Sequence, residues 1–258
     1  LNALRAAGFD AVVDFDDVKT YERFKLLADL QPGCVIGFNK QEYKLYDHSI
    51  PFLDSSSHIS ARYKAVARLF GIEHPHYHYH LPGDAFERER VKTLLAQQQG
   101  SELCIAINPF TASTDKDFCR HQVSALIERL YTLPYKISVV MVGHSEKIRQ
   151  LNLETALHLP DSNINSAVEI VRHCDLVITA DTAIVHIARA FDKPMVAVYN
   201  KRKLKDTGLP GYTIWAPGYD KARQIVCEET NVADMTIDAV WPVIKAQADA
   251  LIAARQQA

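Results

Sequence analysis

The feature that most constrains the fold is a regular alternation of apolar, β-rich runs and amphipathic segments after Gly100. Strands are expected at residues 102–107, 137–142, 175–179 and 194–199, and helices at 117–131, 145–151, 165–173 and 182–191. Strands and helices that alternate in this way are joined by right-handed crossovers, which build a parallel sheet covered on both faces. The sequence therefore predicts a doubly wound α/β domain over residues 101–258, closed by a terminal helix at 236–258.

The first hundred residues carry weaker signals of the same α/β class. The runs at 9–15 and 34–38 have the apolar, β-rich composition of buried strands. Helical spacing of apolar residues predicts a helix at 57–70, and a second at 84–98 that is capped by Asp84 and turns Phe86, Leu94 and Leu95 inward. Because 258 residues suffice for two cores, we expect a first domain over residues 1–100, with the boundary between 81 and 100.

The opening segment, residues 1–8, has the composition of a helix end closed by a glycine. It predicts that the N-terminal domain is truncated.

Composition excludes several classes of protein. A formal net charge of −2 provides no basic field for a phosphate backbone, so we expect no nucleic-acid partner. The five cysteines are widely spaced and never form a C-x-x-C pair, which argues against a disulfide framework and a zinc ribbon and favours a reducing compartment. No apolar run is long enough to span a membrane and no signal peptide opens the chain, so a cytoplasmic location is expected.

Alternate histidines occur at His74, His76, His78 and His80. In an extended segment they share one face, which suits adventitious capture of zinc or nickel. No cysteine or carboxylate completes a tetrahedral set, so no physiological metal and no cofactor are expected.

The loop at residues 108–116 follows the first strand of the second domain. In open α/β sheets ligands bind beyond the carboxyl ends of the strands. This loop offers hydroxyls, amides and the Lys116 ammonium next to a helix start, which suits a diphosphate. The alternative is a solvated connection in which Asp115 caps the helix.

Two further loops follow the neighbouring strands. In the first, residues 179–186, Asp181 or Thr182 can cap a helix whose first amides point toward an anion, and His186 lies one turn on. In the second, residues 143–146, Glu146 can accept hydrogen bonds from a ribose. Capping, a partly buried histidine and an acidic first turn are the corresponding structural interpretations.

Together these motifs resemble glycosyltransferase family 9, the ADP-heptose:lipopolysaccharide heptosyltransferases. The resemblance is carried by Asn108-Pro109, Thr111, Lys116, Gly143, Glu146, the segment D-L-V-I-T-A-D-T-A-I-V-H-I-A at 175–188, and Lys193-Pro194. It extends over about residues 9–245, and its D-T-x-x-x-H-x-A core at 181–188 has the family's spacing to the lysine and proline.

The resemblance implies a GT-B fold of two Rossmann-like domains, in which the C-terminal domain holds a nucleotide sugar and the terminal helix returns toward the first domain. The donor-binding residues would be Thr111, Ser113, Lys116, Gly143, Glu146, Asp181, Thr182, Ala183 and His186. The implied reaction is inverting transfer of heptose from ADP-heptose to a lipopolysaccharide or lipooligosaccharide inner-core acceptor, with peripheral association at the inner membrane. The alternatives are a GT-B enzyme for a UDP- or GDP-hexose and a non-catalytic nucleotide-sugar-binding module.

The chain departs from the family pattern at three places. Ala183 stands where the family usually has glycine, and residues 200–205 replace a loop of the Gly-Pro-Thr type. The basic run at 201–205 suits either acceptor phosphates or a solvated loop. The family's catalytic aspartate lies in a Gly-Asp loop after the first strand, and no segment before Leu1 matches it. We therefore assign no catalytic residue.

Overall fold

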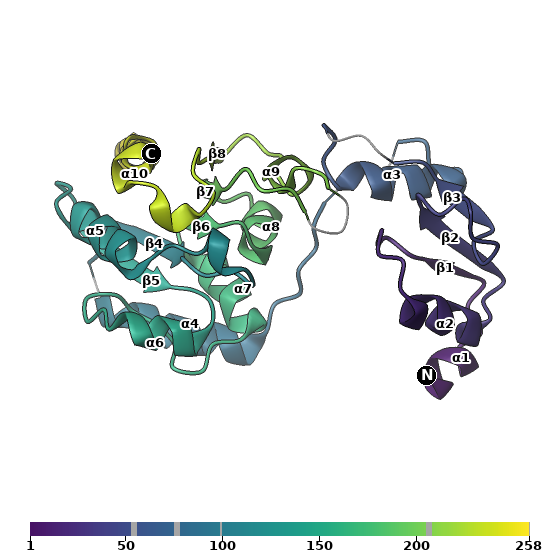
Figure 1. Ribbon diagram of the computed structural model, residues 1–258. Coiled ribbons are helices and arrows are strands. Elements are labelled where there is room, and N and C mark those ends of the chain that lie inside the picture. Colours follow the sequence, from purple (N-terminus) through teal and green to yellow (C-terminus); the bar gives the residue numbers. More distant parts are fainter. Residues whose placement is uncertain (53–55, 75–77, 99, 205–207, 258) are drawn as a thin grey trace. The chain divides into compact units, whose positions relative to one another are not determined.

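A computed structural model describes residues 1–52, 56–74, 78–98, 100–204 and 208–257. The chain forms two compact units, drawn in Figure 1. Unit 1 comprises Leu1–His76 and Lys203–Ile214, and unit 2 comprises Tyr77–Arg202 and Trp215–Ala258. The first segment of unit 1 thus ends at residue 76, whereas the sequence predicted a domain boundary between residues 81 and 100. The roles of the two units as acceptor side and donor side stay predictions.

Unit 1 contains a parallel three-stranded sheet in the order β1-β2-β3. Its elements are α1 (Asn2–Ala6), β1 (Ala11–Val13), α2 (Tyr21–Leu30), β2 (Cys34–Phe38), β3 (His48–Ile50), α3 (Ser60–Leu69) and α9 (Gly211–Ile214). The predicted strand at 34–38 and the helix within 57–70 are confirmed. Helix α2 and the three-residue strand β3 were not predicted, because only Leu27 of α2 is buried and β3 is too short to show a period.

A buried ion pair fixes the loop that follows β1. The Lys40 Nζ atom, on a side chain with no exposed surface, lies 2.7 Å from Asp14 Oδ2. Tyr46 also donates to Asp14 Oδ2 at 2.7 Å, and Arg23 donates to Asp14 Oδ1 at 3.0 Å. Burial raises the pKa of Asp14, but the hydrogen bonds from Lys40 and Tyr46 and the charge of Lys40 lower it by more, so its pKa lies below the usual range. The carboxylate is thereby held charged as a structural anchor.

Unit 2 is built on a fully parallel five-stranded sheet in the order β5-β4-β6-β7-β8. The strands are β4 (Leu103–Asn108), β5 (Ile137–Met141), β6 (Leu176–Ala180), β7 (Met195–Tyr199) and β8 (Ala222–Val226). The helices are α4 (Ala85–Leu95), α5 (Arg120–Tyr131), α6 (Ser145–Leu151), α7 (Ile164–His173), α8 (Ala183–Ala190) and α10 (Ile237–Gln256), with short 3-10 turns η1 (Ala96–Gln98), η2 (Thr114–Lys116) and η3 (Val232–Asp234). The predicted doubly wound α/β architecture is confirmed, and β8 is an additional edge strand.

Helices cover both faces of the unit 2 sheet, as Figure 1 shows: α5 and α10 lie on one side, and α7 and α8 on the other. Alternate strand residues, such as Leu176 and Ile178 in β6, join the core beneath α5 and α10. The intervening Val177 is also fully buried. Burial on both faces explains why these strands read as continuous apolar runs in the sequence.

Helix α4 packs against α7, and Leu94 is buried as predicted. The cap is as expected, since Asp84 Oδ1 accepts from the Glu87 amide at 3.1 Å. Phe86, however, is 71% exposed, so its predicted inward position is wrong. Glu87 is buried instead, because its carboxylate accepts from Asn163 Nδ2 at 2.7 Å at the start of α7. Hydrophobicity alone could not identify this polar contact.

Gln122 ties α5 to the turn that precedes α10. Its Nε2 donates to the carbonyl oxygens of Val232 at 2.8 Å and Met235 at 2.6 Å, and its Oε1 accepts from the Cys119 amide at 2.7 Å. The side chain is buried. Its loss would remove one donor from each carbonyl and the acceptor of the Cys119 amide.

We expect Gln122→Ala to lower the free energy of unfolding by about 2–4 kcal/mol, because the buried partners lose their hydrogen bonds and a cavity remains. Urea denaturation followed by circular dichroism measures this change. Glu128→Ala, at an exposed position on the same helix, is the matched control and should change stability by less than about 0.5 kcal/mol. Equal effects from the two variants would contradict a bridging role for Gln122.

Candidate functional site

The strand order places a change of direction between β4 and β6. From β4 the chain passes through α5 to β5 on one side, and from β6 it passes through α8 to β7 on the other. The loops that leave these two neighbouring strands therefore diverge at the carboxyl edge of the sheet. In open α/β sheets this is the place where ligands bind, and most of the candidate residues lie on these two loops.

The side chain of Asn108, the last residue of β4, connects three loops at this edge. Its amide oxygen accepts from the hydroxyls of Thr179 at 3.0 Å and Thr182 at 2.8 Å. Its amide nitrogen donates to the carbonyls of Phe110 at 3.3 Å and Val142 at 3.0 Å. Every contact in this orientation pairs a donor with an acceptor. Asn108 is buried. It belongs to the motif found in the sequence, but its role in joining the loops was not predicted.

Gly143 brings the loop after β5 against the same side chain. Its φ of +129° lies in a region that favours glycine, and a Cβ atom would come within 2.9 Å of the Asn108 carboxamide. The Gly143 carbonyl accepts from Ser162 Oγ at 2.5 Å, which fixes the loop from its other side. Glycine is therefore required here both by conformation and by close packing.

An ion pair joins the loops after β4 and β6. The Nζ atom of Lys116, at the end of η2, lies 2.6 Å from Asp181 Oδ2. The two side chains are 21% and 9% exposed, so the ammonium remains partly accessible. A lysine ammonium has three donors, and Asp181 occupies one of them. This contact brings together two residues that lie 65 positions apart in the sequence.

The loop that carries Lys116 is held by its own hydrogen bonds. The Thr111 amide donates to Asp117 Oδ1 at 2.6 Å, and the Thr111 hydroxyl donates to the Ser113 carbonyl at 2.6 Å. The Ser113 hydroxyl donates to Asp115. Lys147 from α6 pairs with Asp117 at 3.0 Å. The loop is thus a braced turn in which Asp115 and Asp117 both act as structural acceptors.

Thr182 is the cap of α8. Its hydroxyl accepts from the Ile184 amide at 3.1 Å. The sequence left open whether Asp181 or Thr182 caps this helix, and the structure assigns the cap to Thr182 and the ion pair to Asp181. Ala183 is the first residue of the helix and is exposed. The start of α8 thus presents its positive dipole end beside Lys116 and Asp181.

Glu146 contacts Arg149, and His186 contacts two aromatic rings. Glu146, in the first turn of α6, pairs with Arg149, and among the described residues no hydrogen bond or ion pair joins it to the other candidates. The His186 ring packs edge-to-face between Tyr79, at 5.7 Å, and Trp215, at 5.8 Å. Burial, aided by the charge of Arg189, lowers the pKa of His186, so the ring is neutral at pH 7.

The segment after β7 holds the loop that follows β4. Asn200, buried directly after β7, donates to Asp115 Oδ2 at 3.0 Å, and Arg202 lies 3.5 Å from the same oxygen. Lys201 pairs with Glu228. Two members of the predicted basic run are therefore engaged with carboxylates of this chain. Lys205 lies outside the described residues.

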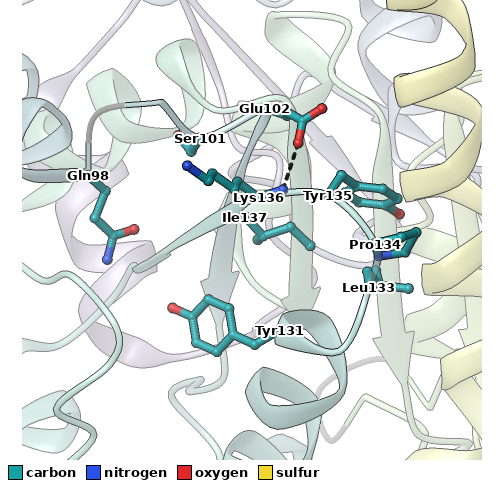
Figure 2. A pocket seen from close by; sticks show the side chains of 9 residues that line it. All are labelled: Gln98, Ser101, Glu102, Tyr131, Leu133, Pro134, Tyr135, Lys136 and Ile137. Atoms are coloured by element: carbon teal, nitrogen blue, oxygen red, sulfur yellow. Dashed lines mark hydrogen bonds between the residues drawn. The ribbon is translucent and has the colours of Figure 1, made fainter.

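A cavity of about 760 Å³ lies at the opposite, amino edge of the sheet (Figure 2). Its walls come from the segments that lead into β4 and β5, and they include Gln98, Glu102, Tyr131 and Lys136. None of the predicted site residues lines it. The candidate site therefore rests on the loops at the carboxyl edge and not on this cavity.

No group of three or more histidine, cysteine, aspartate or glutamate side chains in the described ranges is arranged to hold a metal ion. His76, one of the alternating histidines, lies outside those ranges. No helix in the described part of the chain is long and apolar enough to cross a membrane.

The fold and the edge loops define a two-unit α/β protein of the Rossmann-like type with polar loops gathered where the strand order changes direction. Residues 2–238 match the family described as glycosyltransferase family 9 (heptosyltransferase). The chain belongs to this family, which confirms the resemblance found in the sequence.

Individual relatives agree with the family assignment. The chain is 25% identical over 250 residues to the Escherichia coli K12 protein named "Putative lipopolysaccharide heptosyltransferase 4". The matched region covers 94% of this chain and 67% of the relative.

The solved structures support a GT-B fold. The E. coli ADP-heptose lps heptosyltransferase II has a TM-score of 0.73 at 17% identity, over 99% of this chain and 80% of that one. A family 9 glycosyltransferase from Veillonella parvula has a TM-score of 0.74 at 14% identity, over 97% and 77%. The E. coli heptosyltransferase WaaC with ADP has a TM-score of 0.64 at 18% identity, over 96% and 76%.

The depressed pKa of His186 predicts a pH dependence of stability. In the unfolded chain the ring takes up a proton below about pH 6.5, whereas in the folded chain burial opposes protonation. The folded state therefore keeps its full stability above about pH 6.5, where the ring is neutral in both states. The contribution of His186 to stability is lost as the pH falls through the lower pKa of the folded chain. Thermal unfolding midpoints from pH 7.5 to pH 5 should therefore fall less in His186→Phe than in the unmodified chain. His121→Gln, at an exposed position, is the control and should follow the unmodified chain. If the unfolding midpoint of His186→Phe fell with pH as steeply as that of the unmodified chain, the assigned effect of His186 would be wrong.

Proposed function

We propose that this chain transfers a heptose from ADP-heptose to an inner-core sugar of a lipopolysaccharide or lipooligosaccharide, with inversion at the anomeric carbon. The observation that carries the proposal is the Lys116–Asp181 pair beside the capped start of α8, at the change of direction between β4 and β6. Membership of the heptosyltransferase family and the named activity of the E. coli relative support the choice of sugar. Solved neighbours of this fold hold ADP and ADP-2-deoxy-2-fluoro heptose.

In this proposal unit 2 binds the donor and unit 1 serves the acceptor. The ammonium of Lys116 has donors left over for phosphate oxygens, while Asp181 holds it in place. The first amides of α8, at Thr182 and Ala183, add the positive end of the helix dipole. The Thr111 and Ser113 turn lies on the loop that carries Lys116 and contributes to the diphosphate side of the site, and Gly143 keeps the neighbouring loop close to Asn108.

Glu146 and His186 have different roles in the proposal. The exposed carboxylate of Glu146 is free to rotate away from Arg149 and accept hydrogen bonds from ribose hydroxyls. His186 is neutral and packed between two rings, so it contributes by shape and by hydrogen bonding and not by charge. Ala183, at the exposed helix start, limits the space beside the sugar more than a glycine would.

The chemistry follows from this placement. The acceptor hydroxyl oxygen attacks the anomeric carbon from the face opposite ADP, and its proton passes to a carboxylate base. The bond between the anomeric carbon and the phosphate oxygen breaks, and the electrons remain on ADP. Lys116 and the start of α8 stabilise the negative charge that develops on the leaving diphosphate. This stabilisation lowers the barrier to sugar transfer. An acceptor of this kind is anchored in lipid, so the reaction would take place at the inner membrane surface.

Calorimetric titration with ADP and UDP tests the donor site. We expect ADP to bind more tightly than UDP, and Lys116→Ala to weaken ADP at least tenfold, because a charge-assisted hydrogen bond of about 1.5–3 kcal/mol is lost. Lys136→Ala, at the amino edge of the same sheet, is the matched control and should bind as the unmodified chain does. A preference for UDP would indicate a UDP-hexose donor in place of ADP-heptose. Equal ADP affinity of Lys116→Ala and Lys136→Ala would show that Lys116 does not contact the nucleotide.

The transfer itself needs a separate assay. With ADP-heptose and a heptose-deficient core oligosaccharide, we expect release of ADP together with an acceptor heavier by one heptose residue. Binding of ADP without any transfer, for every core acceptor tested, would reduce the chain to a nucleotide-sugar-binding module.

A further inference from the structure

We propose that Cys104 and Cys174 form a peroxide-sensitive thiol pair that closes to an intramolecular disulfide. Cys104 lies near the start of β4, and Cys174 follows the last residue of α7, two positions before β6 begins at Leu176. Their Sγ atoms are 3.1 Å apart, although the residues are separated by 70 positions in the sequence. All five cysteines of the chain are free thiols. The widely spaced cysteines gave no sign of this pairing in the sequence.

The backbone on both sides of the pair is held in place. The Asp175 amide donates to the Cys104 carbonyl at 2.8 Å, and the Cys104 amide donates to Asp175 Oδ2 at 2.8 Å. The register of β4 against β6 continues from there, with Ile105 opposite Leu176. The two sulfur atoms therefore meet on a rigid scaffold, and formation of a bond between them needs only a small approach of the side chains.

The two thiols differ in a way that gives each a distinct role. Cys104 is partly exposed, whereas Cys174 is fully buried. The hydrogen bond between them lowers the pKa of Cys104, with further support from Ser138, and it raises the pKa of Cys174, as burial also does. Cys104 is consequently the thiol that a small oxidant reaches and that ionises first. Cys174 is the resolving thiol, already in contact with it.

The proposed reaction is oxidation by hydrogen peroxide. The Cys104 thiolate attacks one peroxide oxygen, the O–O bond breaks, and Cys104 becomes a sulfenic acid while hydroxide leaves and is protonated to water. The Cys174 sulfur then attacks Cys104 Sγ, the S–O bond breaks, and a second water leaves with the proton of Cys174. Two thiols are oxidised by two electrons in all, and one peroxide is reduced to two waters.

The disulfide would join the amino ends of β4 and β6, whose carboxyl ends carry the candidate donor loops. The cross-link closes a long stretch of chain, so it should raise the thermal unfolding midpoint by restricting the unfolded state. It lies at the opposite edge of the sheet from Lys116 and Asp181, so affinity for ADP should change less than twofold. The pair is thus independent of the proposed function, and failure of one leaves the other standing.

Disulfide mapping of the full chain tests the inference. After one to two equivalents of peroxide, the remaining thiols are alkylated under denaturing conditions and the intact mass and peptides are measured. We expect three alkylated cysteines of the five in the sequence, a Cys104–Cys174 cross-linked peptide and full reversal by dithiothreitol. Five alkylated cysteines, or a cross-link between any other pair, would overturn the proposal without the need for a variant.

Two variants separate the roles of the thiols. In Cys174→Ser the sulfenic acid on Cys104 should persist and be trapped by dimedone, because no resolving thiol is present. In Cys104→Ser the buried Cys174 should remain unmodified. Cys227→Ser, at another buried cysteine, is the control and should still form the cross-link. Dimedone labelling of Cys174 in Cys104→Ser would contradict the assigned order of attack.

Discussion

The candidate site depends on one buried carboxamide. Asn108 holds the loops after β4, β5 and β6 together through four hydrogen bonds, and Gly143 can approach it only because glycine has no Cβ. A buried amide with all its partners is costly to disturb, because each lost contact leaves a polar group unsatisfied in the interior. The position of Thr182, and with it the start of α8, follows from this amide. The Lys116–Asp181 pair then completes the connection between the β4 and β6 loops.

The same principle operates on a second strand. Asn200, buried directly after β7, braces Asp115 and so supports the loop that ends in Lys116. Polar residues at the carboxyl ends of neighbouring parallel strands thus replace contacts that loops in solvent would otherwise make with water. In the proposed function this arrangement would preorganise the edge for an anion, since the ammonium and the helix start are fixed before a ligand arrives.

Much of the fold followed from the sequence, because strands buried on both faces of a parallel sheet are continuous apolar runs with caps and glycines between them. The family motif also placed Lys116, Asp181 and Thr182 at one edge. Helix α2 was missed because it buries only Leu27, and strand β3 because it is short. Phe86 was misplaced because the buried Glu87 is satisfied by a residue far along the chain. The amide contacts of Asn108 and the meeting of Cys104 with Cys174 depend on tertiary register, which local patterns do not contain. One sequence signal could have indicated the role of Asn108, because an asparagine at the end of an apolar strand is a polar side chain at a buried position.

The most direct test of the account is a crystal structure of the chain with ADP bound. The account predicts the diphosphate against Lys116 and the first turn of α8, at the carboxyl edge between β4 and β6, with Asn108 still bridging Thr179 and Thr182. Nucleotide bound instead in the cavity beside Tyr131 and Lys136, or away from unit 2, would contradict the claim that the change of direction in the sheet forms the donor site.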